Sequence, residues 1–354
     1  MENNNNNTTN YKSHNSTARL PDLLTEAWIW TTVQLIIALV GIVINAAVIF
    51  AAVSFNSLRK GIHGLILSLA IASLLCDVFL KPSGAIALVL QWYGCRPARR
   101  CAVYTPLLQW FISTVSYHIA AISINRFMAV VFPHTYHAVK RPKVTAALLL
   151  FCWLVPLIVA VICASGVLGM YSAAPPFGYC LPESAARNLT FLVQTTMVYG
   201  PTLVMALCYA GIFVKFLMIR GKVVPMDSLG RLAPLSQTRI LRKRIRASQT
   251  IFFCFLLFCF NYYPATLAYL VDSRSPQRYP YMFLWFRALS QSATSINPII
   301  YTCLMPEFRK ALVRRLCWKK AVRTSDSYGV PLAAASRRNI RLVPVHGTSS
   351  IPSI

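Results

Sequence analysis

The sequence predicts an all-α membrane protein: a seven-transmembrane helix bundle with a short amphipathic eighth helix. Hydrophobic residues make up 56% of the 354 residues and charged residues only 12%, whereas soluble domains carry about 25% charged residues. Long uncharged runs recur along the chain, and a helix rising roughly 1.5 Å per residue needs runs of this length to cross roughly 30 Å of hydrocarbon. The spans are expected at about 28–53, 65–91, 101–133, 145–168, 190–219, 239–270 and 281–303.

The net charge of +26 could indicate nucleic-acid binding, since basic chains are attracted to phosphate backbones. Its distribution favours another interpretation. Most Lys and Arg lie in the segments that the predicted spans place on one side, as expected for cytoplasmic loops. The basic excess is therefore read as topology, together with attraction to anionic inner-leaflet lipid, and no nucleic-acid partner is expected.

Four regions follow from this pattern: a tail at 1–27, the membrane domain at 28–303, an amphipathic membrane-surface helix at 304–320 and a disordered cytoplasmic tail at 321–354. The first tail is rich in Asn, Thr and Ser and has no charged-then-apolar start, so no cleaved signal peptide is expected. N-x-Ser/Thr sequons begin at Asn6, Asn7, Asn15 and Asn188. N-glycosylation occurs on extracellular segments, so these sequons predict an extracellular N-terminus. The alternative is an unmodified disordered tail.

The third span is the reference for the others. It starts at Cys101, continues without charge for most of its length and ends in Asn125-Arg126-Phe127. An arginine at the bilayer centre is costly, but near a helix end it can reach polar surroundings or a partner. Arg126 is therefore a candidate functional residue.

This span resembles the third helix of rhodopsin-like G-protein-coupled receptors, in which a cysteine starts the helix and Asp-Arg-Tyr ends it. Each span carries a landmark of that family: Asn45, Pro82, Arg126, Trp153, Pro201, Pro264 and Pro298. The triplet is also similar to the Asn-Arg-Tyr of melatonin receptors, and the segments YYPATLAYLVDSR and SINPIIY look similar to medium-chain fatty-acid receptors.

The resemblance implies roles for individual residues. It implies a disulfide between Cys101 and Cys180, with Cys95 as a competitor for Cys180. It implies helix-packing roles for Asn45, Ser73, Trp153 and Pro201. The residues implied in activation and G-protein coupling are Asn125, Arg126, Phe127, Tyr209, Phe258, Pro264, Asn297, Pro298 and Tyr301. Cys317, in the basic amphipathic segment, is a candidate for palmitoylation.

Several positions depart from the family pattern. Ser73 stands where an aspartate is usual and Val115 where a serine is frequent, so the usual sodium pocket is expected to be absent. Tyr262 replaces a tryptophan beneath the ligand. Arg244 stands where the family has an acidic residue that would form an ion pair with Arg126. Without that ion pair, we expect the contact between the third and sixth helices at the Arg126 side to be weak.

Asp77 and Lys81 lie four residues apart in the second span, so they face each other on a helix. One interpretation is an ion pair that neutralises both. The other is that Lys81 serves the ligand pocket.

The charged residues in the spans indicate which class of ligand could bind. Leu108 stands where amine receptors have an aspartate, and Gln291 where an opsin needs its retinal lysine. Arg287 lies in the half of the seventh span away from Arg126, and an intramembrane cation is by default a functional-site candidate. We expect Arg287, with Lys81, to receive an anionic or carboxylate group of a ligand that could be lipid-like. The alternative is that Arg287 reaches the interface or pairs with Asp272.

Gln109, Tyr262 and Tyr269 are expected to line the same pocket, beside Leu108 and Gln291. The resemblance implies a plasma-membrane receptor that passes an extracellular signal to a heterotrimeric G protein by outward movement of the sixth helix, with arrestin, receptor kinases and membrane lipid as further partners. No catalytic residue, metal site or cofactor is expected, so the chain is not predicted to be an enzyme. The first alternative is a seven-helix receptor that is not coupled to G protein, and the second, less favoured alternative is a transporter.

Overall fold

The computed structural model describes residues 20–55, 61–93, 100–139, 141–183, 187–221, 235–272 and 275–304. All of them belong to one compact unit, Met1–Arg309. Most of the predicted tail at 1–27 and all of the tail at 321–354 lie outside the described residues, whereas residues 20–27 begin the first helix. Nearly all of the predicted amphipathic helix, the sequons at Asn6, Asn7 and Asn15, and Cys317 lie outside them as well.

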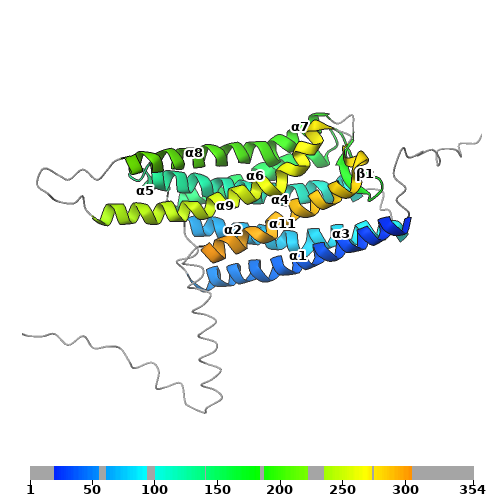
Figure 1. Ribbon diagram of the computed structural model, residues 1–354, viewed down its shortest axis with the longest axis horizontal. Coiled ribbons are helices and arrows are strands. Elements are labelled where there is room, and N and C mark those ends of the chain that lie inside the picture. The colour runs from blue at the N-terminus through cyan, green and yellow to red at the C-terminus, as the bar shows by residue number, and fades with distance from the viewer. Residues whose placement is uncertain are drawn as a thin grey trace, which may run out of the picture. The chain divides into compact units, whose positions relative to one another are not determined.

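The predicted spans correspond to long helices that lie side by side (Figure 1). Three spans are single helices: α1 (Leu20–Ser54), α4 (Arg100–Val131) and α6 (Pro142–Ala164). The second span consists of α2 (Ile62–Leu75), the π-helical turn η2 (Cys76–Leu80) and α3 (Lys81–Leu90). The fifth consists of α7 (Arg187–Gln194), the π-helical turn η4 (Thr195–Tyr199) and α8 (Gly200–Gly221). The sixth and seventh are α9 (Leu235–Val271) and α11 (Pro280–Leu304).

Short elements connect these helices: η3 (Gln91–Tyr93), α5 (Tyr136–Val139) and α10 (Ser275–Arg278). Several boundaries differ by a few residues from those predicted. The first helix begins at Leu20, eight residues before the predicted residue 28. Residues 20–27 include polar side chains, so hydropathy alone does not show that the helix extends through them. The fifth span begins at Arg187, before the predicted residue 190, so Asn188 lies exposed in the first turn of α7.

Within the described residues, five helical segments are long and apolar enough to cross a membrane: Pro21–Ser54, Ile62–Tyr93, Arg100–Val131, Pro142–Ala164 and Arg187–Met218. In α4, 72% of the apolar stretch is buried, against 50% or less in the other four. This helix contacts α2, α6, α8 and α9. It is therefore the central helix of the bundle.

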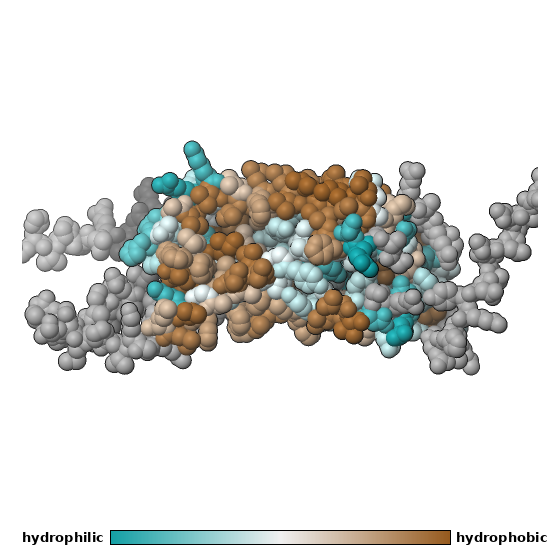
Figure 2. Space-filling model, turned by 90° about the horizontal axis from the view of Figure 1, so that it is seen from above, coloured by the Kyte–Doolittle hydropathy of each residue, from teal (hydrophilic) through white to brown (hydrophobic). Residues whose placement is uncertain are grey.

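The polarity of the bundle is that of a membrane protein. Large apolar side chains such as Leu39, Val43 and Phe260 are more than 60% exposed. Figure 2 shows one face of the bundle, with hydrophobic surface mostly in the middle and hydrophilic residues toward the two ends. Polar side chains lie inside instead. Asn45, His118 and Asn297 are each at most 1% exposed. Buried polar groups usually find hydrogen-bond partners, as the side chains of Asn45 and His118 do. Neither polar atom of the Asn297 side chain has a partner in the described part of the chain.

One buried polar cluster joins α2, α4 and α6. The Trp153 indole N–H donates to Ser68 Oγ at 2.9 Å, and His118 Nε2 lies 2.9 Å from the same oxygen. The Trp110 indole donates to the carbonyl of Trp153 at 3.2 Å. Trp153 therefore contributes to packing with both its polar edge and its ring.

The two π-helical turns precede prolines. Proline has no N–H to continue the hydrogen-bond ladder, and a neighbouring wide turn absorbs the mismatch. Thus η2 ends two residues before Pro82, and η4 two residues before Pro201. The sequence predicts unbroken spans at both places, because hydropathy does not distinguish a π-helical turn from an α-helical one.

A β-hairpin covers one end of the bundle. Strands β1 (Tyr171–Ala174) and β2 (Tyr179–Pro182) pair antiparallel, with Ala173 opposite Cys180. Gly178 in the connecting turn has a φ of 61°, in the left-handed region that favours glycine. We call this the hairpin end of the bundle, and the opposite end, which carries Arg126, the Arg126 end.

Candidate functional site

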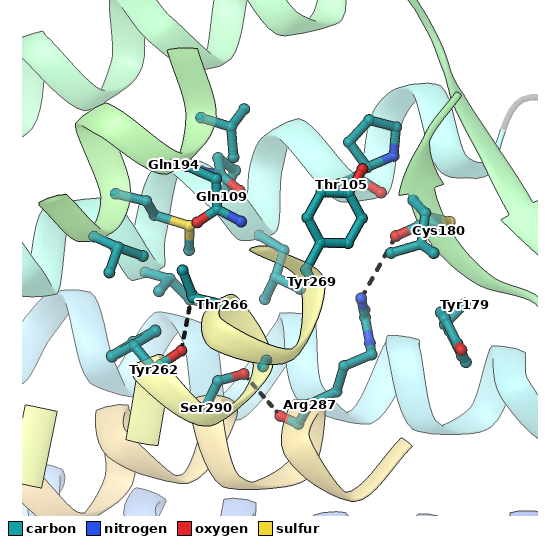
Figure 3. A pocket seen from close by; sticks show the side chains of 18 of the residues that line it. Thr105, Gln109, Tyr179, Cys180, Gln194, Tyr262, Thr266, Tyr269, Arg287 and Ser290 are labelled. Carbon is teal, nitrogen blue, oxygen red and sulfur yellow. Dashed lines mark hydrogen bonds between the residues drawn. The ribbon is translucent and has the colours of Figure 1, made fainter. Parts of the chain in front are cut away.

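A cavity of about 210 Å³ lies beneath the hairpin, between α4, α7, α9 and α11. Six of the seven residues predicted to bind ligand line it: Leu108, Gln109, Tyr262, Tyr269, Arg287 and Gln291. They come from three helices far apart in the sequence, and Figure 3 shows several of them together.

Arg287 reaches from α11 toward the hairpin. Its Nη1 lies 3.5 Å from the carbonyl oxygen of Cys180, to which it donates, and its Cζ lies 5.6 Å from the centre of the Tyr179 ring. Burial raises the pKa of Tyr179 to about 12, so the ring is neutral at physiological pH. Its hydroxyl donates to the carbonyl of Pro276 at 2.8 Å, which fixes the ring. A neutral aromatic face attracts a cation.

The cavity is positively charged at this end. No Asp or Glu is among the described residues that line it. Asp272, the alternative partner considered for Arg287, forms an ion pair with Arg278 at 3.1 Å. A guanidinium held by a carbonyl and an aromatic ring keeps donors for a carboxylate, with which arginine forms bidentate hydrogen bonds.

The structure adds polar cavity residues that the sequence interpretation missed: Thr105, Tyr179, Gln194, Thr266 and Ser290. Only Tyr179 carried a usable signal, since it precedes a cysteine expected to form a disulfide. The others are ordinary polar residues of helices, and only the bundle geometry turns them inward.

Lys81 does not line the cavity. Its Nζ lies 2.5 Å from Asp77 Oδ1 and donates to Ser295 Oγ at 2.5 Å. Both charged side chains are fully buried. The pairing interpretation is therefore the right one, and the assignment of Lys81 to the ligand pocket is wrong. The reason is the i,i+4 spacing, which brings the ammonium onto the carboxylate within one helical turn.

The pair is tied to two more helices. The Asn45 side-chain N–H donates to Asp77 Oδ2 at 3.1 Å, and Ser295 Oγ donates to Asp77 Oδ1 at 2.9 Å. Gly41 leaves room for this carboxylate, because a Cβ there would meet it. The cluster of Asn45, Asp77, Lys81 and Ser295, which we call the charge cluster, joins α1, η2, α3 and α11.

The predicted disulfide is present. Cys101 and Cys180 are bonded, with 5.4 Å between their Cα atoms and 79 residues between them in sequence. The bond ties the start of α4 to β2. It thereby holds the Cys180 carbonyl and Tyr179 beside Arg287.

We expect Cys101→Ala and Cys180→Ala each to lower the free energy of unfolding by about 2–5 kcal/mol, because a cross-link over a long loop restricts the unfolded chain. Thermal unfolding of the purified protein measures this. Cys152→Ala, which removes a free buried thiol, is the control and should change the transition less. The double variant should match each single variant; equal stability of wild type and single variants contradicts the expectation.

At the Arg126 end, the Tyr136 hydroxyl of α5 donates to Asn125 Oδ1 at 3.1 Å. Tyr209 Oη and Ser123 Oγ lie 3.1 Å apart. Phe127 packs against α8 at Gly211, where a Cβ would meet the phenylalanine ring. The triplet predicted for coupling is thus embedded between α5 and α8, with Arg126 partly buried between its neighbours.

The remaining predicted residues fall in α9, α11 and the packing core. Phe258 is 1% exposed and its ring centroid lies 4.6 Å from that of Tyr262. Pro264 lies inside α9, and Pro201 and Ser73 are buried. Pro298 and Tyr301 lie in α11, and Arg244 lies in α9, but their side chains are outside the described part.

Comparison with known proteins agrees with this architecture. Residues 44–301 match the sequence profile of the family described as 7 transmembrane receptor (rhodopsin family). The chain is similar to trace amine-associated receptor 8c of Rattus norvegicus, with 26% identity over 76% of this chain and 80% of that protein. It is also similar to 5-hydroxytryptamine receptor 4 of the same species, with 25% identity over 79% of this chain and 74% of that protein.

Among solved structures, the fold is similar to that of squid rhodopsin, with a TM-score of 0.67, 18% identity, and coverage of 88% of this chain and 93% of the other. The profile match covers more than half of the sequence and includes every described helix from α2 to α9. This chain therefore belongs to the rhodopsin family of seven-transmembrane receptors.

Proposed function

We propose that this receptor detects a small ligand carrying an anionic group, and that Arg287 binds that group. Membership of the family makes the chain a multi-pass plasma-membrane receptor, not an enzyme, that signals from an extracellular ligand through heterotrimeric G proteins. The observation that carries the proposal is the Arg287 guanidinium in a cavity with no described acidic lining residue.

The relatives named above refer in their names to trace amines and 5-hydroxytryptamine, which are amines. A protonated amine is best received by a carboxylate, and in this chain the corresponding third-helix position is Leu108, 6% exposed and apolar. With a cation in the cavity instead, an amine would be repelled. The sign of the site thus supports a ligand of opposite charge to those amines.

The size and walls of the cavity support a small or slender ligand. A volume of about 210 Å³ is below the range of about 300–1,000 Å³ typical of pockets for drug-sized molecules. Apolar lining by Leu108, Ile112 and Val198 suits a hydrocarbon body. A short or medium-chain carboxylate combines these properties with the required charge.

We further propose that the hairpin end is extracellular, with glycans on Asn6, Asn7, Asn15 and Asn188, and that Cys317 is palmitoylated. The proposed activating motion swings the Arg126 end of α9 outward about Pro264, because a proline removes a backbone hydrogen bond and allows bending. Arrestin, receptor kinases and membrane lipid are proposed as further partners at the opposite side.

The test uses membranes that contain the receptor and G proteins of each class. Straight-chain carboxylates of increasing length are added, and guanine-nucleotide exchange is measured. For Arg287→Met we expect potency to fall about a hundredfold, since charged hydrogen bonds contribute about 1.5–3 kcal/mol or more when buried.

Arg278→Met is the matched control. It removes another guanidinium from the hairpin end, but this one is exposed and paired with Asp272, away from the cavity lining. Its potency should equal that of the wild type at equal surface expression. Equal potency of Arg287→Met and wild type rules out the proposed function.

A further inference from the structure

The proposed function leaves a second polar group of the cavity unexplained. Gln109 of α4 is 7% exposed, lines the cavity, and its Nε2 has no hydrogen-bond partner in the described part of the chain. A side-chain amide carries two N–H donors. Burying such a donor without an acceptor is unfavourable, so a group that the ligand brings is the natural partner.

Gln109 and Arg287 lie on different sides of the cavity. Gln109 comes from α4 and Arg287 from α11, and Figure 3 shows them on two sides of the cavity with Tyr269 between them in that view. The charged group that Arg287 holds beneath the hairpin therefore leaves the Gln109 amide for another atom of the ligand. Apolar residues from facing elements complete the lining: Leu108, Ile112, Met197 and Val198.

We infer that the ligand is bipolar: besides the anionic group at Arg287, it carries a neutral hydrogen-bond acceptor, a carbonyl or hydroxyl oxygen, that binds the Gln109 amide across an apolar segment. This inference rests on the proposed function. It narrows the ligand class from carboxylates in general to carboxylates substituted with oxygen away from the acid group.

The sequence alone does not reach this conclusion. A glutamine in a membrane span is as readily a packing residue that hydrogen-bonds to a neighbouring helix. Gln291 of α11 lines the cavity as well and is 4% exposed. Its side chain is not among the buried groups without a partner. The unpaired donor therefore distinguishes Gln109 from Gln291. Gln34 is also buried and its amide has no partner in the described part of the chain, but it does not line the cavity.

The probes are pairs of carboxylates with equal chain length, one saturated and one with a ketone placed successively along the distal half. A ketone oxygen only accepts hydrogen bonds, so it reports on the Gln109 donor. Nucleotide exchange in membranes and thermal stabilisation of the purified receptor are measured for both. On the wild type we expect the best keto acid to be about tenfold more potent than its saturated partner, the worth of one net hydrogen bond.

Gln109→Leu and Gln109→Met should abolish that advantage, so that the keto acid and the saturated acid become equally potent. Gln291→Leu, the matched control, should keep the preference for the keto acid. Arg287→Met should weaken both acids alike. Surface expression is measured for each variant, and two apolar replacements guard against a single one that folds poorly.

The outcomes separate the two proposals. Equal potency of keto and saturated acids at every ketone position, or equal losses for both acids in the Gln109 variants, overturns the bipolar ligand and leaves the role of Arg287 standing. Wild-type receptor that neither responds to nor is stabilised by any acid, or Arg287→Met with unchanged potency for both, overturns the proposed function and the inference with it.

Discussion

Lys81→Met should destabilise the receptor by about 3–5 kcal/mol, because removing one partner leaves the other charge buried and uncompensated. Asp77 and Lys81 are both fully buried, with 2.5 Å between Nζ and Oδ1. Asp77→Asn should have a loss of the same order, since the amide can still accept from Ser295 but cannot neutralise Lys81. Thermal unfolding in lipid nanodiscs measures both.

The double variant Asp77→Asn with Lys81→Met makes this prediction specific. Replacing a buried ion pair by neutral groups of similar volume is often nearly neutral for stability. The double variant should therefore recover most of the stability lost in each single variant. If the losses of the two single variants simply add in the double variant, the two charges do not compensate each other and the charge cluster has been misread.

Arg126→Ala should abolish ligand-stimulated nucleotide exchange while the ligand still stabilises the purified receptor. Arg126 is partly buried at the end of α4 opposite the hairpin. A charge is kept at such a position when it meets a partner or polar surroundings. Ligand binding at the hairpin end and G-protein binding at the Arg126 end are coupled. Loss of the Arg126 contact with the G protein therefore lowers nucleotide exchange, whereas the ligand cavity at the other end is unchanged.

Arg141→Ala is the control for this variant. Arg141 precedes α6 and is exposed, so its replacement removes a positive charge from the same end without altering α4. Exchange should persist in that variant. Undiminished exchange in Arg126→Ala would mean that the Asn125-Arg126-Phe127 triplet does not carry the coupling role.

Much of the fold could be predicted because a membrane-spanning helix needs a long apolar run, which is visible in the sequence. Each predicted span has a helical counterpart, and the third span, which served as the reference for the others, is the most buried of the described membrane-spanning helices. The disulfide followed from the resemblance, and Cys180 is bonded to Cys101 rather than to Cys95.

Details that depend on a few hydrogen bonds were not predictable. The β-hairpin has two strands of four residues, too short for a clear alternation of apolar and polar residues, and the turn between them contains two consecutive prolines before Gly178. The π-helical turns likewise leave no trace in composition. These local features nevertheless shape the site, because η2 carries Asp77 and β2 carries the carbonyl that contacts Arg287.

The ligand site was predicted only in part, because the sequence shows which spans carry a charge but not which way each side chain points. Arg287 stood out as a charge in an apolar span, and it lines the cavity. Lys81 stood out equally, yet it lies in the charge cluster. Only the direction of each side chain separates the two, and that direction follows from helix rotation in the bundle. Thr105 and Gln194 had no such signal and were found from the cavity alone.

The most direct test of an anion-binding cavity is charge inversion at Arg287. Exchange is measured for wild type and Arg287→Glu with two ligands of one carbon skeleton, a carboxylate and the corresponding primary amine. We expect the wild type to respond to the carboxylate and not to the amine, and the variant to lose the response to the carboxylate and to prefer the amine. An unchanged order of preference in the two proteins would contradict it.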